Sequence, residues 1–198
     1  MLSGRTIFDE PHHQSLELLA VQALGRGDAV TAFRLADRRC RISPLPEPHS
    51  YVLRGDAFFG LGNMAAASAD IVSALALAPH GIGANRRMLA WGQGEQRRQA
   101  ALALIACDSN VDVLAKAIEI VRADGQRAIA NVRIFDDAIE GWAVWEKRAS
   151  LEVSVADDAN RVAALFEPAP EHRFRTFGRA TNFRLPRPRS TKPQLVLL

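Results

Sequence analysis

The feature that most constrains the fold is a helix-hairpin pattern that occurs twice, with a shift of 35 residues. In the second copy, Ala67 and Ile71 lie at helical spacing, and Pro79 follows them. This spacing predicts a helix that ends before the proline. The positions that recur are Gly55, Phe58, Gly62, Ala67, Ile71 and Pro79, which match Ala20, Ala23, Gly27, Ala32, Ala36 and Pro44. A period of this length is typical of stacked helical hairpins.

The spacing resembles the tetratricopeptide repeat, which has small or aromatic residues on its first helix, alanine on its second and a closing proline. The resemblance covers about residues 12–79. Leu16 and Tyr51 stand where this family usually has Trp, Arg54 replaces a usual Leu, and Arg39 replaces a usual Ala. The resemblance implies paired helices whose first members line a concave groove.

A third, less regular unit is expected to begin near Gly83. It has no closing proline, and Gly92 and Gly94 interrupt it. Terminal units of helical arrays are commonly atypical. A further helix is predicted over residues 109–125, with a Ser or Asn cap at its start and Gly125 at its end.

After Gly125 the apolar period becomes close to two. Runs of alternating residues, separated by turn residues, lie at 128–135, 138–145, 150–156, 160–168 and 193–198. Such short strands predict an antiparallel sandwich or half-barrel. We therefore predict an α+β fold, with a helical repeat domain over 1–125 and an all-β, sandwich-like module over 126–198. The last run ends at Leu198 without a cap or polar tail, which suggests a longer polypeptide.

The segment from His172 to Lys192 is basic and contains no acidic residue. Arginines interleaved with phenylalanines are typical of surfaces that bind single-stranded nucleic acid. They are also typical of a charged sheet edge that resists pairing with other molecules. We favour the sheet edge, because no nucleic-acid motif accompanies the charge. The candidate polyanion-binding residues are Arg173, Arg175, Arg179 and Arg184.

No arrangement in the sequence predicts a catalytic, metal or cofactor site. There is no P-loop, no GxGxxG after a strand and no GxSxG elbow. The histidines are scattered, and the pairs Asp136–Asp137 and Asp157–Asp158 are better explained as hairpin turns than as cation ligands. We expect Cys40 and Cys107 to be free, packed thiols.

Neither a secretory signal nor a membrane segment is predicted. The first residues contain no apolar run, and Asn63 and Asp70 interrupt the small, apolar stretch from Gly55 to Pro79. We therefore expect the protein to be cytoplasmic.

The order of these segments resembles the N-terminal region of certain bacterial multidomain glycosyltransferases. The resemblance is carried by "ANRRMLAW" at residues 84–91 and "VRIFDDAIEGWAVW" at 132–145. It implies that a family-two-like catalytic domain with a DxD metal motif would follow. No DxD motif occurs within residues 1–198, so this chain would be the non-catalytic accessory part.

Trp142 and Trp145 are expected on opposite faces of a strand. An exposed ring there could stack on a sugar, but we favour packing of both rings because Trp is mostly buried in proteins. The groove that the repeat resemblance implies would be lined by Gln14, Glu17, Val21, His49, Val52, Asp56 and Phe59. This set lacks the basic clamp with which members of the family hold a peptide carboxylate, so a mixed partner or the protein's own next domain is expected.

Two hypotheses are consistent with the sequence. The first, which we favour, is a non-catalytic scaffold that positions a glycosyltransferase domain or its acceptor. The second is a stand-alone adaptor whose basic C-terminal module binds nucleic acid or another polyanion. Ionic strength separates them, since binding through phosphates weakens steeply with salt.

Overall fold

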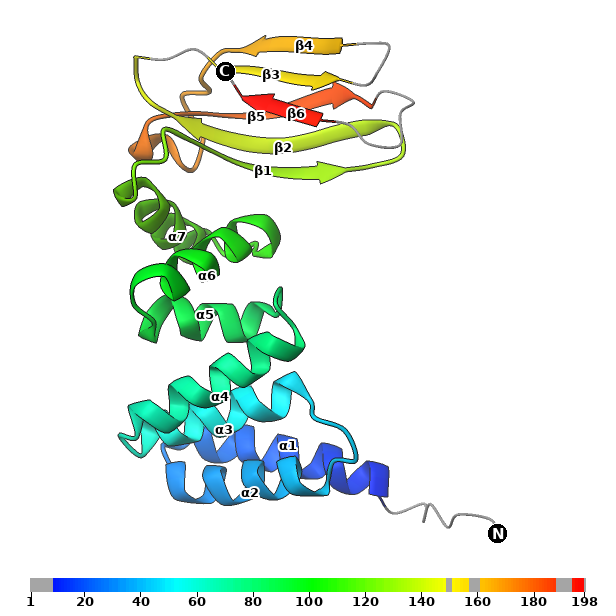
Figure 1. Ribbon diagram of the computed structural model, residues 1–198, viewed down its shortest axis with the longest axis vertical. Coiled ribbons are helices and arrows are strands. Elements are labelled where there is room, and N and C mark those ends of the chain that lie inside the picture. The colour runs from blue at the N-terminus through cyan, green and yellow to red at the C-terminus, as the bar shows by residue number, and fades with distance from the viewer. Residues whose placement is uncertain (1–8, 149–150, 157–160, 188–193, 198) are drawn as a thin grey trace. The chain divides into compact units, whose positions relative to one another are not determined.

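The computed structural model describes residues 9–148, 151–156, 161–187 and 194–197. Helices precede strands along the chain, which confirms the predicted α+β class (Figure 1). The chain divides into two compact units, Met1–Ala103 and Leu104–Leu198. We describe each unit by itself.

The N-terminal unit consists of consecutive helical hairpins. Its helices are α1 (Asp9–Gly25), α2 (Ala29–Ile42), α3 (Pro48–Gly60), α4 (Met64–Leu77), α5 (Ile82–Trp91) and the first part of α6 (Gly94–Cys107). The two copies of the sequence pattern thus form the hairpins α1–α2 and α3–α4. The third, irregular unit corresponds to α5 and α6, and its Gly92 and Gly94 lie at the turn between these helices.

The two regular hairpins turn in the same way. Gly27 and Gly62 have φ angles of +75° and +76°, a left-handed conformation that glycine adopts without strain and that commonly ends a helix. The residue after each glycine caps the next helix: Asp28 Oδ1 accepts from Thr31 N at 3.0 Å, and Asn63 Oδ1 accepts from Ala66 N at 3.1 Å.

Small residues allow the paired helices to approach closely. Ala32, Ala57 and Ala67 are completely or almost completely buried. A Cβ atom added to Gly55 would lie 3.2 Å from Ile71 Cδ1 and 3.3 Å from the Ala67 carbonyl oxygen. Small side chains at Gly55 and at these alanines therefore lie at the contact between helices.

Arg39, which departs from the repeat pattern, joins the two regular hairpins. The residue is 8% exposed and forms ion pairs with Glu17 of α1 at 2.8 Å and with Glu47 at 3.0 Å. It also donates a hydrogen bond of 2.8 Å to Ser50 Oγ in α3. A buried guanidinium is stable only when it is paired in this way.

Arg54, the second such departure, makes a comparable set of contacts from α3. Its Nε and Nη2 atoms donate to the two carboxylate oxygens of Asp70 in α4, both at 2.8 Å. Its Nη1 donates to Asp37 of α2 at 3.1 Å. The neighbouring carboxylates hold the pKa of Arg54 above its ordinary value. Two arginines thus supply polar contacts where the repeat family has apolar ones.

The C-terminal unit contains the last part of α6, the helix α7 and two sheets. Its elements are α7 (Val111–Ala123), β1 (Ala128–Ile134), β2 (Ala138–Trp145), β3 (Leu151–Ala156), β4 (Arg161–Phe166), the 3-10 turn η1 (Arg175–Phe177), β5 (Arg179–Pro186) and β6 (Gln194–Leu197). The described strands form two antiparallel sheets in the orders β1-β2-β5 and β4-β3-β6. Strand β5 lies inside the basic segment and at an edge of its sheet, where the favoured sheet-edge interpretation placed this segment; its bounds were not predicted.

One face of the β1-β2-β5 sheet packs against β4. Ile139, Trp145 and Phe183 belong to the buried cluster on this face, and Phe166 of β4 packs against it. The rings of Phe166 and Phe183 have centroids 5.9 Å apart. The two sheets are therefore in apolar contact.

The compact units divide within α6, at Ala103, and not at Gly125, where the expected domains divide. Asn131 of β1 explains the difference, because its Nδ2 donates to the carbonyl oxygens of Ile105 at 2.7 Å and Ala106 at 3.0 Å. The end of α6 is thus bonded to the sheet. Although the backbone changes from helix to strand between Ala123 and Ala128, α7 lies in the same compact unit as the strands.

Candidate functional site

The predicted groove residues of α1 and α3 do not all face solvent. Gln14 and Val21 are exposed, Val21 at 46%. Val52, however, is only 6% exposed and packs in a buried cluster with Ile71 and Met88. The Val52 side chain therefore contributes to the core.

Ionic contacts of the predicted groove residues connect the first helices of adjacent hairpins. Glu17 Oε1 lies 2.8 Å from His49 Nε2, which connects α1 and α3. Asp56 receives hydrogen bonds of 2.9 and 2.6 Å from Nε and Nη2 of Arg87, which connects α3 and α5. These carboxylates are already paired, so they are not free anionic groups for a partner.

Phe59 of α3 and Trp91 of α5 form an aromatic pair in the N-terminal unit. Their ring centroids are 4.6 Å apart, and the rings are almost parallel, at 4°. Phe59 nonetheless remains 46% exposed. The aromatic pair is therefore a fixed apolar surface that is partly open to solvent.

The other candidate surface is the face of the β1-β2-β5 sheet opposite to β4. The strand register aligns Arg133, Glu140 and Arg184 in one row across the sheet. The neighbouring row, two residues along each strand, is Asn131, Trp142 and Asn182. Residues two apart on a strand share a face, so these two polar rows lie side by side.

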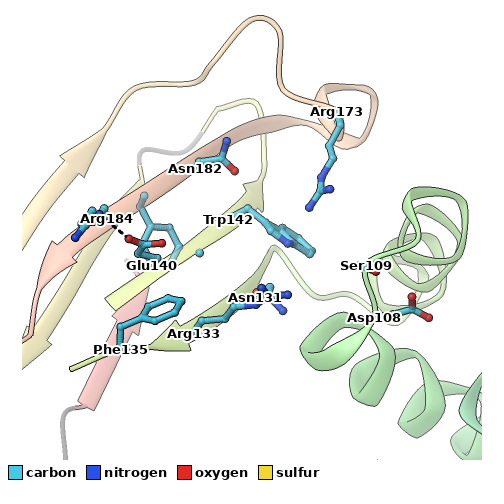
Figure 2. Close-up of a pocket in the computed structure, with 12 residues that line it drawn as sticks. Asp108, Ser109, Asn131, Arg133, Phe135, Glu140, Trp142, Arg173, Asn182 and Arg184 are labelled. Carbon is cyan, nitrogen blue, oxygen red and sulfur yellow. Dashed lines mark ion pairs between the residues drawn. The ribbon is translucent and has the colours of Figure 1, made fainter. Parts of the chain in front are cut away.

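A cavity of about 620 Å³ lies over these rows. The loop residues Asp108 and Ser109 line it from the α6–α7 connection, and Arg173 lines it from the segment before η1 (Figure 2). In Figure 2 the Arg173 side chain points toward the Trp142 ring. The cavity is comparable in size to sites that hold small ligands.

The charged groups around this cavity are unequally paired. Arg184 forms ion pairs with Glu140 at 2.9 Å and Asp137 at 3.2 Å. The Arg173 guanidinium lies 4.9 Å from the centroid of the Phe174 ring. Among the residues that the structure describes, Arg133 makes no ion pair or hydrogen bond through its side chain.

His172 supports this site in its neutral form. Its Nδ1 accepts from the Phe174 backbone N–H at 3.2 Å, and its Nε2 lies 3.2 Å from Asn182 Oδ1. Because Nδ1 is an acceptor, Nε2 carries the single proton and donates it to Asn182. Burial is the main cause that lowers the pKa of His172.

The four predicted polyanion-binding arginines do not all line one cavity. Arg173 and Arg184 line the cavity. Arg175 donates to the Pro170 carbonyl oxygen at 2.9 Å, and Arg179 begins β5 opposite Trp145. Arg133 was not among the predicted site residues. Asn131 and Arg133 are polar and two residues apart on β1, and this spacing could have indicated a polar face of the strand.

Neither predicted sugar-stacking residue presents an exposed ring. Trp142 is 6% and Trp145 is 2% exposed. Trp142 packs on Phe174 with ring centroids 4.8 Å apart, whereas Trp145 belongs to the core on the other face of the sheet. Both tryptophan rings are therefore packed in the protein.

Metal and thiol chemistry add no further site to the described part of the chain. No group of three or more His, Cys, Asp or Glu side chains there could hold a metal ion. Asp136 and Asp137 lie in the turn between β1 and β2, whereas Asp157–Asp158 lies outside the described residues. Neither Cys40 nor Cys107 forms a disulfide in the described part of the chain, and burial raises the pKa of the Cys40 thiol. Across the same described ranges, no helix combines the length and apolar character needed to cross a membrane.

Comparison with known proteins supports the repeat interpretation of the helices. The chain is 60% identical over 38 residues to tetratricopeptide repeat protein 16 of Homo sapiens and of Macaca fascicularis. The helical unit is tetratricopeptide-like. The match covers 19% of this chain and only 4% of each of these relatives. No protein-family model and no solved structure matches the chain, and nothing in these comparisons supports the glycosyltransferase resemblance.

Proposed function

We propose that the tetratricopeptide-like unit is a non-catalytic scaffold that binds a segment of a protein partner. The observation that carries this proposal is the exposed Phe59 ring, stacked on Trp91. Fixed aromatic side chains are typical anchors of protein interfaces because they bury a large apolar area and lose little conformational entropy on binding.

The surroundings of this aromatic pair favour a partner of mixed chemistry. Asp56 and Arg87 hold each other beside it, and the Arg87 side chain remains 33% exposed. An apolar side chain of the partner would pack on Phe59, while a carbonyl or carboxylate near it would accept from Arg87. An array of so few hairpins offers a short surface, so we expect modest affinity unless the partner is tethered.

We further propose that this partner is a catalytic domain of the same polypeptide. The order of the segments resembles the N-terminal region of bacterial glycosyltransferases, and a tethered domain would compensate for a short binding surface. In this proposal the chain is an accessory region for polysaccharide or glycoconjugate synthesis in the cytoplasm. Transfer of the sugar would then be carried out by the neighbouring domain.

We prefer this function to the nucleic-acid adaptor. An extended polyanion needs a continuous track of available cations. Arg184 is paired with two carboxylates, and Arg175 is bonded to a backbone carbonyl.

Site-specific cross-linking tests the scaffold. A photoreactive benzoylphenylalanine replaces Phe59 in the full-length protein in its own cells, and the same group replaces Val72 of α4, which is 43% exposed, as the matched control. We expect position 59 alone to cross-link to one defined protein segment, and Trp91→Ala to weaken that product. Equal products from positions 59 and 72 would contradict the proposal.

The intact mass of the endogenous protein tests the accessory-region part separately. A mass well above the 21.7 kDa of this chain, together with nucleotide-sugar-dependent transfer by the longer protein, would support it. A mass of 21.7 kDa would refute the accessory region and leave the scaffold proposal standing.

A further inference from the structure

The cavity over the polar face of the β1-β2-β5 sheet contains cationic groups that the described residues do not neutralise. Glu140 lies opposite Arg133 in the strand register, but its carboxylate pairs with Arg184 on the neighbouring strand. Arg133 is thus left without an anionic partner among the described residues. Arg173 comes from a separate segment, lies over the ring of Phe174, and forms no ion pair with the described residues.

The remaining carboxylate of the cavity is also engaged. Asp108 is 3% exposed, and its Oδ1 accepts from the backbone N–H of Asn110 at 2.9 Å. This oxygen is therefore bonded to the backbone of its own loop. Two guanidiniums from different elements, lining one cavity without ion pairs, are the arrangement that recognises a phosphate or carboxylate.

The floor of the cavity offers further contacts to a ring compound. Trp142 is fixed by Phe174 and flanked by Asn131 and Asn182. Both Nδ2 hydrogen bonds of Asn131 go to carbonyl oxygens of α6, and Asn182 Oδ1 accepts from His172. Within the described ranges this leaves the Asn131 oxygen and the Asn182 amide N–H groups for a ligand, so the floor presents an acceptor and a donor on either side of an indole.

We propose that this cavity binds a small organic anion, a sugar-sized ring whose phosphate or carboxylate group is held by Arg133 and Arg173. The ring lies over the small part of Trp142 that is open to the cavity, and its hydroxyl groups bond to Asn131 and Asn182. The neutral form of His172 keeps Asn182 in position, because its Nε2–H donates to the Asn182 oxygen. This site is independent of the protein-binding surface on the helical unit.

Calorimetric titration of the intact chain tests the site. The probes are glucose 6-phosphate, glucuronate, neutral glucose and a single-stranded RNA oligonucleotide. Each is titrated into the unaltered protein and into the variants Arg133→Gln and Arg173→Gln. Arg127→Gln is the control, since this side chain is 85% exposed, lies outside the cavity lining and loses the same charge.

We expect glucose 6-phosphate or glucuronate to bind, and each cavity variant to weaken binding about tenfold or more, because a charge-assisted hydrogen bond is lost. Arg127→Gln should change the Kd less than about twofold, since screening by salt is strong at exposed sites. Preference for one of the two probes identifies phosphate or carboxylate as the recognised group.

Three results would overturn the proposal. The first is no heat of binding when either anion is added to about 10 mM, because a Kd above that concentration would be too weak for a specific site. The second is glucose binding as tightly as its phosphate, since Arg133 and Arg173 would then have no role. The third is RNA binding without binding of the small anions, which would indicate a surface for a macromolecule. Unchanged circular dichroism of Arg133→Gln and Arg173→Gln verifies that any loss of binding is not a loss of folding.

Discussion

Replacing Arg54 by methionine is expected to destabilise the helical unit substantially. Arg54 is the only described residue that forms an ion pair with Asp70, and Asp70 has a side chain only 8% exposed. Methionine has a similar length but cannot donate hydrogen bonds. The substitution therefore leaves a carboxylate buried between α3 and α4 without its cation.

The expected loss follows from the burial of the pair. Breaking a fully buried ion pair by removing one partner costs about 3–5 kcal/mol. The Arg54 side chain is 21% exposed, so water partly screens the pair. We therefore expect a loss of about 2–3 kcal/mol in the free energy of unfolding. Asp37 adds little to this loss, since it keeps its 2.6 Å ion pair with Arg41.

Urea unfolding followed by circular dichroism at the helical band measures this loss, and hydrogen exchange of α3 and α4 localises it. Arg41→Met is the matched control, because it removes an ion pair with the same Asp37. Since the Arg41 side chain is 77% exposed, this substitution should lower the free energy of unfolding by less than about 0.5 kcal/mol. In a double-mutant cycle with Asp70→Asn, Arg54 and Asp70 should show a coupling energy above about 1 kcal/mol. Equal losses for Arg54→Met and Arg41→Met, or additive effects in the cycle, would refute this reasoning.

Three further changes test other parts of the structure. Burial lowers the folded-state pKa of His172, so the unfolded chain binds the proton more readily. Stability should therefore fall as the pH drops below about 6.5. Melting temperatures measured between about pH 7 and 5 should show this fall, and His172→Gln should reduce it. Gly141→Ala should cost about 1–3 kcal/mol in thermal melts, since its Cβ would clash with the Asn131 carbonyl oxygen, whereas Gly25→Ala, with open space, should not destabilise. Asn63→Ala should remove the cap of α4 and lower the urea midpoint by the equivalent of about 1 kcal/mol, and an unchanged midpoint would show that the cap is not needed.

The helical hairpins could be predicted because their signals are local. A glycine that adopts a left-handed conformation and a following cap residue specify each turn within a few residues, as at Gly27–Asp28 and Gly62–Asn63. The helix over 109–125 was likewise predicted from its cap and its terminal glycine, and α7 spans Val111–Ala123 with Asn110 as its cap.

The cavity could not be predicted, because it depends on strand register. Arg133, Glu140 and Arg184 are distant in sequence and form one row only when β1, β2 and β5 pair. The sequence indicated a charged sheet edge in this segment but not the bounds of β5, whose buried positions alternate with exposed ones over most of its length. Arg133 was consequently missed, while Arg175 and Arg179 were assigned to a site whose cavity they do not line.

The amino-acid sequence by itself determined the succession of helical hairpins followed by strands, because periodicity, caps and glycine turns act over a few residues. Only the tertiary structure decided what the unusual arginines do. In the repeat pattern Arg39 and Arg54 are departures, and their meaning came from Glu17, Asp37 and Asp70 on neighbouring helices. An ion pair depends on distance in space, and that distance is set by packing between elements that are far apart along the chain.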